Sequence, residues 1–527
     1  MSTELEPPGA PTGTTTGSPT GAPTEAPTGA TEGFRKSLGL PDVIAQSLSV
    51  IAPAMSGAFL TYLASTKAGG ATPLAYLFGT LAMLCVGGTV AQFARSLSSA
   101  GSMYTYITRG ANRWVGFLGG WCYAAAFLIL GGAVLCGFGF FTASMVELLG
   151  GAKVSWAWFS LVGLVLIALM SLFDVQASTR VQLAILLLSM VALLVVAIVV
   201  ITVGSPAVSA LDHRTPVANP GTHLDLGAFW PSSAGIPWTG ILFGLSFAML
   251  SFTGAEASAV LSEETREPRR VIPRAVVGSI VLAGLFYLVI TYATAIGFGV
   301  RQAATDWPSS VAGLAAVAPN RAFAAIVLGC AALASLFCAL GVHMAVSRVL
   351  FAMGRERVLP AWLGWLHPRW NTPWRAIGLD IVVWLLLASG SVLLTSRATQ
   401  VAVAGGVDSE VTGGVFVFTF LAGLGTPLVM FVYLLLGVAG TLQGRRTGRA
   451  GFQLVAVLAG LVGALAVFGS LYYSFTPSTP GAPIPAVVAM VPWVCAAIAV
   501  TGLLVATWVR HRKPTAWADM GTVFDEV

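Results

Sequence analysis

Charged residues are scarce in this sequence. Only 9% of its 527 residues are Asp, Glu, Lys or Arg, whereas 56% are hydrophobic. A water-soluble domain typically carries about 25% charged residues. This deficit excludes a water-soluble globule. Together with a mean hydropathy of +0.84, it indicates a protein that crosses the membrane many times.

Motifs for nucleotide binding, metal binding and hydrolysis are also missing. The chain has four lysines, and none lies in a GxxxxGK[ST] phosphate-binding loop. It contains no HExxH zinc motif and no GxSxG nucleophile motif, and its six cysteines form no CxxC pair. We therefore expect no enzymatic activity, no metal, no cofactor and no direct use of ATP.

Long apolar stretches, by contrast, are abundant. A membrane span needs about 20 mostly apolar residues, and in lipid such a stretch must be helical because every backbone group has to be paired within it. The sequence predicts twelve spans: 42–64, 72–94, 114–147, 155–173, 180–203, 236–261, 272–299, 322–346, 374–395, 411–438, 452–475 and 485–509.

Basic residues set the predicted orientation. If the N-terminus is cytoplasmic, 21 of the 27 Lys and Arg residues fall in cytoplasmic segments and six fall outside, as the positive-inside rule requires. Both termini are then cytoplasmic, and the net charge of +6 reflects topology and attraction to anionic lipid rather than nucleic-acid binding. Residues 1–33 are rich in Pro, Gly and Thr and predict a disordered tail, and residues 510–527 form a short cytoplasmic tail.

Two predicted spans contain helix-breaking residues at similar depth. Span 1 carries Pro53 followed by Ser56 and Gly57, and span 6 carries Gly254. Secondary transporters often bind substrate at two such discontinuous helices, whose freed N–H groups suit a carboxylate and whose freed carbonyls suit a cation. Close packing of small residues is the alternative explanation for a single break, but a matched pair favours a binding site.

Two acidic residues lie inside predicted spans, apart from the edge residues Asp42 and Glu147. Glu256, two residues after Gly254, is costly in lipid, which favours a proton carrier or a sensor at an inner gate; the alternative is a fixed hydrogen bond that locks span 6. Asp380 lies near the end of span 9 close to Arg375, and we expect a structural pairing between those two residues.

Four stretches together resemble the amino acid–polyamine–organocation (APC) superfamily. They are FTGAE (252–256), EETREPRRVIPRA (263–275), AGSMYTYITRGANRWVGFLGGW (100–121) and SRVLFAMGRERVLPAWLGWLHPRWNTP (347–373). The resemblance covers about residues 40–510. It implies an all-α polytopic membrane protein with a 34–509 transporter domain: a leucine-transporter-like inverted 5+5 helix bundle, with repeats at about 42–203 and 236–438, plus two extra helices at about 452–509.

The resemblance also implies a substrate site. It places a substrate carboxylate near Met55, Ser56 and Gly57, and an ammonium on the backbone near Phe252, Thr253 and Gly254. Phe252 is also the candidate for an aromatic that shields the bound substrate. Tyr123 and Phe337 are candidates for pocket walls, and Glu256 is the candidate for proton coupling or gating.

Two positions depart from patterns known in relatives. Leu250 stands where some relatives carry a gating Trp, which weakens an assignment to exchangers of guanidinium substrates. Ser189 aligns with the span 5 lysine of some proton-coupled relatives, and that span contains no Lys. The coupling ion therefore stays open between H⁺, Na⁺ and plain exchange.

The predicted function is secondary transport of an amino acid across a bacterial inner membrane, as ion-coupled import or exchange by alternating access, by a monomer or homodimer. The alternative is a polyamine or other organic-amine transporter, but such a substrate would require more acidic residues than Glu256 in the pocket. The charged run 263–275 connects spans 6 and 7 and can pair with the Arg-rich loops 2–3 and 8–9 as part of an inner gate. The alternative is an ordinary solvated loop.

Overall fold

The computed structural model describes residues 36–171, 175–206, 208–211, 224–307, 312–368, 372–402, 409–475 and 486–521. All of them belong to one compact unit, Gly33–Val527. The predicted N-terminal tail lies outside the described residues.

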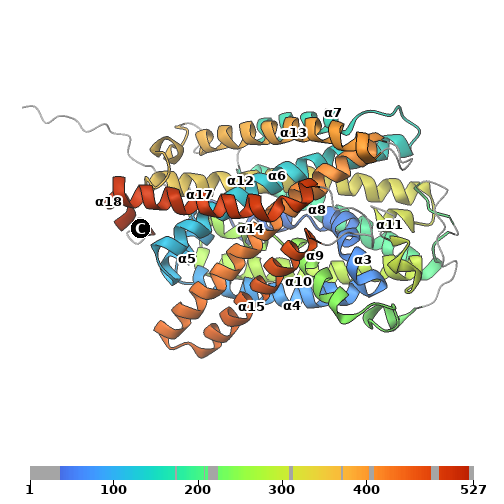
Figure 1. The fold of residues 1–527 in the computed structure, drawn as a ribbon, viewed down its shortest axis with the longest axis horizontal. Helices are drawn as coiled ribbons and strands as arrows, with labels where there is room; N and C mark the ends of the chain where they lie inside the picture. Colours follow the sequence, from blue (N-terminus) through green and yellow to red (C-terminus); the bar gives the residue numbers. More distant parts are fainter. Residues whose placement is uncertain are drawn as a thin grey trace, which may run out of the picture. The chain divides into compact units, whose positions relative to one another are not determined.

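The described part of the chain is helical and contains no β-strand, only isolated bridges such as the one between Leu38 and Thr265. Its helices are α1 (Leu40–Ile51), α2 (Pro53–Met55), η1 (Ser56–Leu60), α3 (Thr61–Ala68), α4 (Thr72–Ala94), α5 (Met103–Gly110), α6 (Arg113–Leu148), α7 (Trp156–Met170), α8 (Val175–Val203), α9 (Trp238–Leu250), η4 (Ala255–Leu261), α10 (Pro268–Phe298), α11 (Gly313–Ala316), α12 (Arg321–Arg355), α13 (Trp374–Ala402), α14 (Ser409–Thr447), α15 (Ala450–Tyr473), α16 (Ala486–Ala489), α17 (Val491–Arg512) and α18 (Pro514–Ala518), together with short 3₁₀ turns (Figure 1).

Nine helical stretches of the described chain are long and apolar enough to cross a membrane. The first, Leu40–Ala94, contains two of the predicted spans, and α7 is a shorter apolar helix. The prediction of an all-helical, multi-pass membrane protein is confirmed. The count of twelve spans and the inverted repeat stay predictions.

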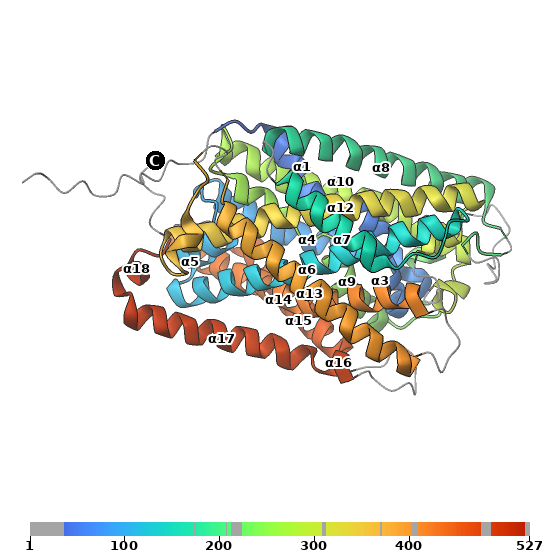
Figure 2. The same cartoon turned by 90° about the horizontal axis from the view of Figure 1, so that it is seen from above.

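Helix α6 occupies the interior, where it packs against α5, α7, α12 and α14. Its most apolar window is 89% buried, against 22% for α17, which runs along one edge in Figure 2 while α8 runs along the opposite edge. Val181, Leu188, Val191 and Ile198 recur at helical spacing on α8 and expose 52–69% of their surface. Such an apolar outer face is suited to lipid.

Asparagine caps fix the starts of the two central helices. The Asn112 side chain accepts from the Val115 N–H at 3.0 Å at the start of α6, and the Asn320 side chain accepts from the Ala322 N–H at 3.0 Å at the start of α12. Each cap satisfies an N–H group that has no partner in the preceding turn.

Candidate functional site

The first predicted break begins at Ala52, one residue before the proline. Ala52 adopts φ 44° and ψ 64°, which ends α1 in the left-handed region, although its N–H still donates to the Leu48 carbonyl at 2.9 Å. Pro53 then restarts the helix without an N–H to donate. The predicted Ser56–Gly57 position forms the start of η1, a single wider π-helical turn, a feature that is frequent at functional sites.

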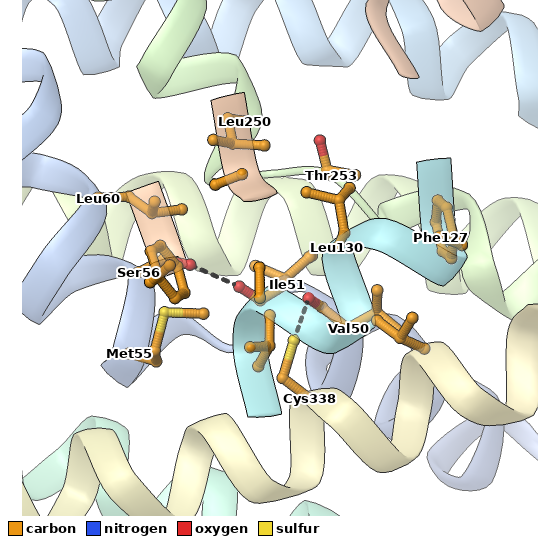
Figure 3. A pocket seen from close by; sticks show the side chains of 15 residues that line it. Val50, Ile51, Met55, Ser56, Leu60, Phe127, Leu130, Leu250, Thr253 and Cys338 are labelled. Carbon is orange, nitrogen blue, oxygen red and sulfur yellow. Dashed lines mark hydrogen bonds between the residues drawn. The ribbon is translucent and has the colours of Figure 1, made fainter. Parts of the chain in front are cut away.

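Side chains satisfy the carbonyls that this break leaves open. The Cys338 thiol donates to the Val50 carbonyl at 3.1 Å, and the Ser56 hydroxyl donates to the Ile51 carbonyl at 2.9 Å (Figure 3). The Tyr287 hydroxyl donates to the Ser251 carbonyl at 2.8 Å and lies 3.5 Å from the same Ile51 oxygen. The end of α1 is therefore held by side chains from α12 and η1. The first N–H groups after Pro53, by contrast, have no carbonyls in a preceding turn to bond.

The second break lies at the predicted glycine. Gly254 has φ 100° and separates α9 from the 3₁₀ helix η4. The carbonyls of Phe252 and Gly254 accept from the N–H groups of Ala255 and Ala257 at 3.1 and 2.8 Å. No backbone N–H of the described chain donates to the Thr253 carbonyl, so this oxygen can accept from a cationic ligand.

The two breaks touch each other. A Cβ atom on Gly254 would lie 2.1 Å from Val50 Cγ1, so only glycine permits this approach in the left-handed conformation. The Ser47 hydroxyl of α1 also donates to the Ala255 carbonyl at 2.7 Å. Spans 1 and 6 are thus joined at the level of their breaks.

A cavity of about 40 Å³ lies beside this junction (Figure 3). One water needs about 10–15 Å³ on this measure, so the cavity accommodates a few waters and must widen to accept an amino acid. Its lining carries only three polar side chains, those of Ser56, Thr253 and Cys338, and no acidic residue. The remaining lining residues are Val50, Ile51, Met55, Leu60, Phe127, Leu130, Ala133, Val134, Leu250, Val342, Phe418 and Ala422.

Three of the predicted site residues line the cavity: Met55, Ser56 and Thr253. Gly254 lies at the junction of the two breaks. Gly57 faces α10, since a Cβ there would lie 3.1 Å from a ring atom of Phe286.

The predicted aromatic residues lie just outside the cavity. The Phe252 ring packs edge-on against Tyr287 with centroids 5.0 Å apart, and the Tyr123 ring lies 4.2 Å from that of Phe127. Phe337 contributes its carbonyl, which accepts from the Ser49 hydroxyl of α1. Phe127 and Phe418 line the cavity instead. Neither was identified from the sequence, because aromatic residues occur in most of the predicted spans.

Glu256 is buried at the second break. Its Oε2 accepts from the Gly254 N–H at 3.2 Å and from the Tyr433 hydroxyl at 2.9 Å. Its other oxygen, the Thr253 hydroxyl and the Tyr123 hydroxyl are buried without a hydrogen-bond partner among the described residues. Tyr433 lies 177 residues away in sequence, and no local pattern could have identified it.

The charged run after span 6 forms ion pairs with the end of α12. Glu263 binds Arg355 through two N···O contacts of 2.8 and 3.2 Å and also accepts from the Ala100 N–H at 2.8 Å. Glu264 binds Arg348 at 2.6 Å. The predicted pairing of this run with loop 8–9 is confirmed by these two arginines. Its contact with loop 2–3 is the hydrogen bond from the Ala100 N–H, and pairing with the arginines of that loop stays a prediction.

The predicted pairing of Asp380 with Arg375 is wrong. Asp380 binds the His343 ring at 2.5 Å, while the Arg375 guanidinium stacks over the rings of Trp365 and Trp374 at 4.2 and 5.1 Å. Residues five apart on a helix are separated by about 140° around its axis, so Asp380 and Arg375 point in different directions. This five-residue spacing is visible in the sequence and argues against a pairing of the two residues.

Residues 38–507 match the model of the family described as amino acid permease. A low-affinity putrescine importer of Escherichia coli is 26% identical over 64% of this chain and 71% of its own. A branched-chain amino acid permease of Lactococcus lactis is 26% identical over 82% of this chain and 88% of its own. A gamma-aminobutyric acid permease of Escherichia coli is 25% identical over 72% and 74%.

Proposed function

Because the chain belongs to the amino acid permease family, we propose that it is a secondary transporter of amino acids with apolar side chains. The observation that carries this proposal is the junction of the two helix breaks beside a cavity. Start-of-helix N–H groups after Pro53 can bind a carboxylate, and the Thr253 carbonyl and hydroxyl can bind an ammonium. The apolar lining suits the side chain, as the name of the Lactococcus relative, a branched-chain amino acid permease, also suggests.

Transport requires the cavity to open to each side in turn. We place the inner gate at the ion pairs of Glu263 and Glu264 with Arg355 and Arg348, which join the end of η4 to the end of α12. In this proposal spans 1–5 and 6–10 form the inverted repeats that move against each other, spans 11 and 12 lie outside them, and both termini are cytoplasmic. The protein resides in the plasma membrane.

An organic amine is the second candidate substrate, because a relative is a putrescine importer and Glu256 has an unpaired oxygen. A diamine carries two cations and no carboxylate, so it needs acidic groups in the pocket. Since no acidic residue lines the cavity, an amino acid fits better than a diamine.

A thermal-shift screen of the purified protein discriminates between the two candidates. A ligand that binds only the folded state raises the melting temperature. We expect valine or leucine to stabilise the protein and their decarboxylated amines and putrescine to have no effect. Stabilisation by amines alone would contradict the amino acid assignment.

A matched pair of variants tests the position of the site. Thr253→Val removes a cavity hydroxyl while keeping the shape, and we expect it to weaken substrate binding about tenfold. Thr202→Val, on the exposed end of α8, is the control and should bind substrate like the unmodified protein.

A further inference from the structure

A second, smaller cavity lies between α7, α12 and the start of α13. Its volume is about 20 Å³, room for about one water molecule. Five polar side chains line it. They are Ser171, His343, Ser347, Arg348 and Thr372.

His343 connects this cavity to a buried acid. His343 Nδ1 and Asp380 Oδ2 are 2.5 Å apart, and the two side chains are only 1% and 0% exposed. His343 Nε2 and Asp380 Oδ1 have no hydrogen-bond partner among the described residues. The pair therefore keeps a buried nitrogen beside a water-sized polar space that could deliver a proton to it.

We propose that the His343–Asp380 pair binds the proton that drives transport; this inference rests on the proposed transport function. A hydronium ion in the cavity gives its proton to the imidazole, which forms an N–H bond and leaves a water molecule. The pair changes from a neutral imidazole beside a carboxylate to an imidazolium–carboxylate pair, and its net charge changes from −1 to zero. An uncompensated buried charge is costly, and a neutralised pair is less so. The pair therefore holds the proton while it is closed off from water and releases it when water reaches it.

The charged residue that shares this cavity with the pair is itself ion-paired. Arg348 is the other charged residue lining the cavity, and it is bound to Glu264 at 2.6 Å and to the Met344 carbonyl at 3.0 Å. The Trp384 ring of α13 lies 5.8 Å from the His343 ring, and α6 packs on Trp384 through Gly131. Met170 and Ser171 line the cavity from the end of α7, and neither carries a charge.

Helix α12 links the pair to both the substrate cavity and the inner ion pairs. Cys338 and Val342 line the substrate cavity, His343 lines the second cavity, and Arg348 joins the inner ion pairs. A shift of α12 that widens one cavity necessarily moves the other, because one rigid helix forms a wall of both. This shared wall is a physical route by which proton binding and substrate movement can be coupled.

Proteoliposomes test the coupling. We expect an inward proton gradient to drive accumulation of the stabilising amino acid by the unmodified protein. Asp380→Asn and His343→Gln should reduce that accumulation at least tenfold and leave counterflow exchange of the same substrate within about threefold. His367→Gln, outside the pair, is the control. Gradient-driven accumulation that survives in both variants overturns the proton site, whereas absence of counterflow in the unmodified protein overturns the proposed function instead.

A spectroscopic measurement tests the site without a substrate and without altering the pair. Replacing His213, His223, His367 and His511 by Gln leaves His343 as the single histidine. Its ¹⁵N imidazole signals should report a change of protonation between pH 5 and 9. A signal that keeps one protonation state across that range shows a fixed structural pair and overturns the proposal.

Discussion

Gly254 is the residue on which the candidate site depends most. Its φ of 100° and the 2.1 Å that would separate a Cβ from Val50 Cγ1 mean that Gly254→Ala must distort one of the two breaks. We expect a loss of roughly 2–4 kcal/mol of stability from backbone strain and overpacking, with loss of substrate binding. Thermal melting of the purified variant measures the first effect and ligand-induced stabilisation measures the second.

Gly278→Ala is the matched control for that substitution. Gly278 lies in α10, and a Cβ atom added there would meet no other atom within 4 Å, while alanine is the better helix former. This variant should melt at or slightly above the temperature of the unmodified protein. An equal loss of stability in both variants would show that the crowding at Gly254 is not the cause.

Glu256 holds the second break through one oxygen, and glutamine can keep that geometry without the charge. Glu256→Gln should fold normally, since its amide oxygen can still accept from the Gly254 N–H and the Tyr433 hydroxyl. We expect the dependence of substrate affinity on pH to flatten between pH 5 and 8. Affinity measured by ligand-induced stabilisation across that range tests this, with Tyr433→Phe as the variant that retains the acid. An unchanged pH profile in Glu256→Gln would make Glu256 a structural residue.

At the scale of helices, the end of α12 meets the C-terminal segment at a buried acid. Glu356 accepts hydrogen bonds from the Tyr104 hydroxyl and from the Gly521 N–H, the latter at 3.0 Å. Trp517 of α18 packs against Trp114 with ring centroids 4.9 Å apart. Burial raises the pKa of Glu356 from its ordinary 4.5 to about 7, although both hydrogen bonds and the neighbouring Arg355 and Arg109 lower it.

This raised pKa predicts how stability changes with pH. The folded protein binds the Glu356 proton more tightly than the unfolded chain, so this contribution is complete below about pH 4.5 and is lost as pH rises to about 7. The shift corresponds to on the order of 3 kcal/mol. Glu356→Gln should flatten the decline in melting temperature between pH 5 and 7.5. Glu267→Gln, which alters an exposed glutamate, should retain the decline, and a retained decline in both variants would contradict the assignment to Glu356.

Sequence reasoning located the helices and the second break more securely than the first. Apolar runs predict spans because a segment in lipid must pair all its backbone groups, which a helix does. Gly254 predicts a break because glycine tolerates positive φ. The exact start of the first break could not be predicted, since Ala52 is held at φ 44° by contacts from distant helices to Val50 and Ile51. Tyr433 and the His343–Asp380 pair were missed for the same reason, because their contacts join residues far apart in the chain.

At the scale of the whole molecule, the proposed inner gate requires an orientation in which its ion pairs face the cytoplasm. The positive-inside rule predicts that the α14–α15 turn at Arg449 lies inside and that the α6–α7 loop at Lys153 lies outside. Both positions are exposed. Four of the six native cysteines are buried and the other two only partly exposed, so the unmodified chain should give little background labelling.

We expect a membrane-impermeant maleimide to label Lys153→Cys in intact cells and to label Arg449→Cys only after the membrane is opened. The unmodified chain serves as the background control, and uptake by each variant confirms that it is folded. The opposite labelling pattern would show that the protein has the reverse orientation in the membrane. Glu263, Glu264, Arg348 and Arg355 would then close the outer side, and the small cavity beside His343 would exchange its proton with the outside of the cell rather than with the cytoplasm.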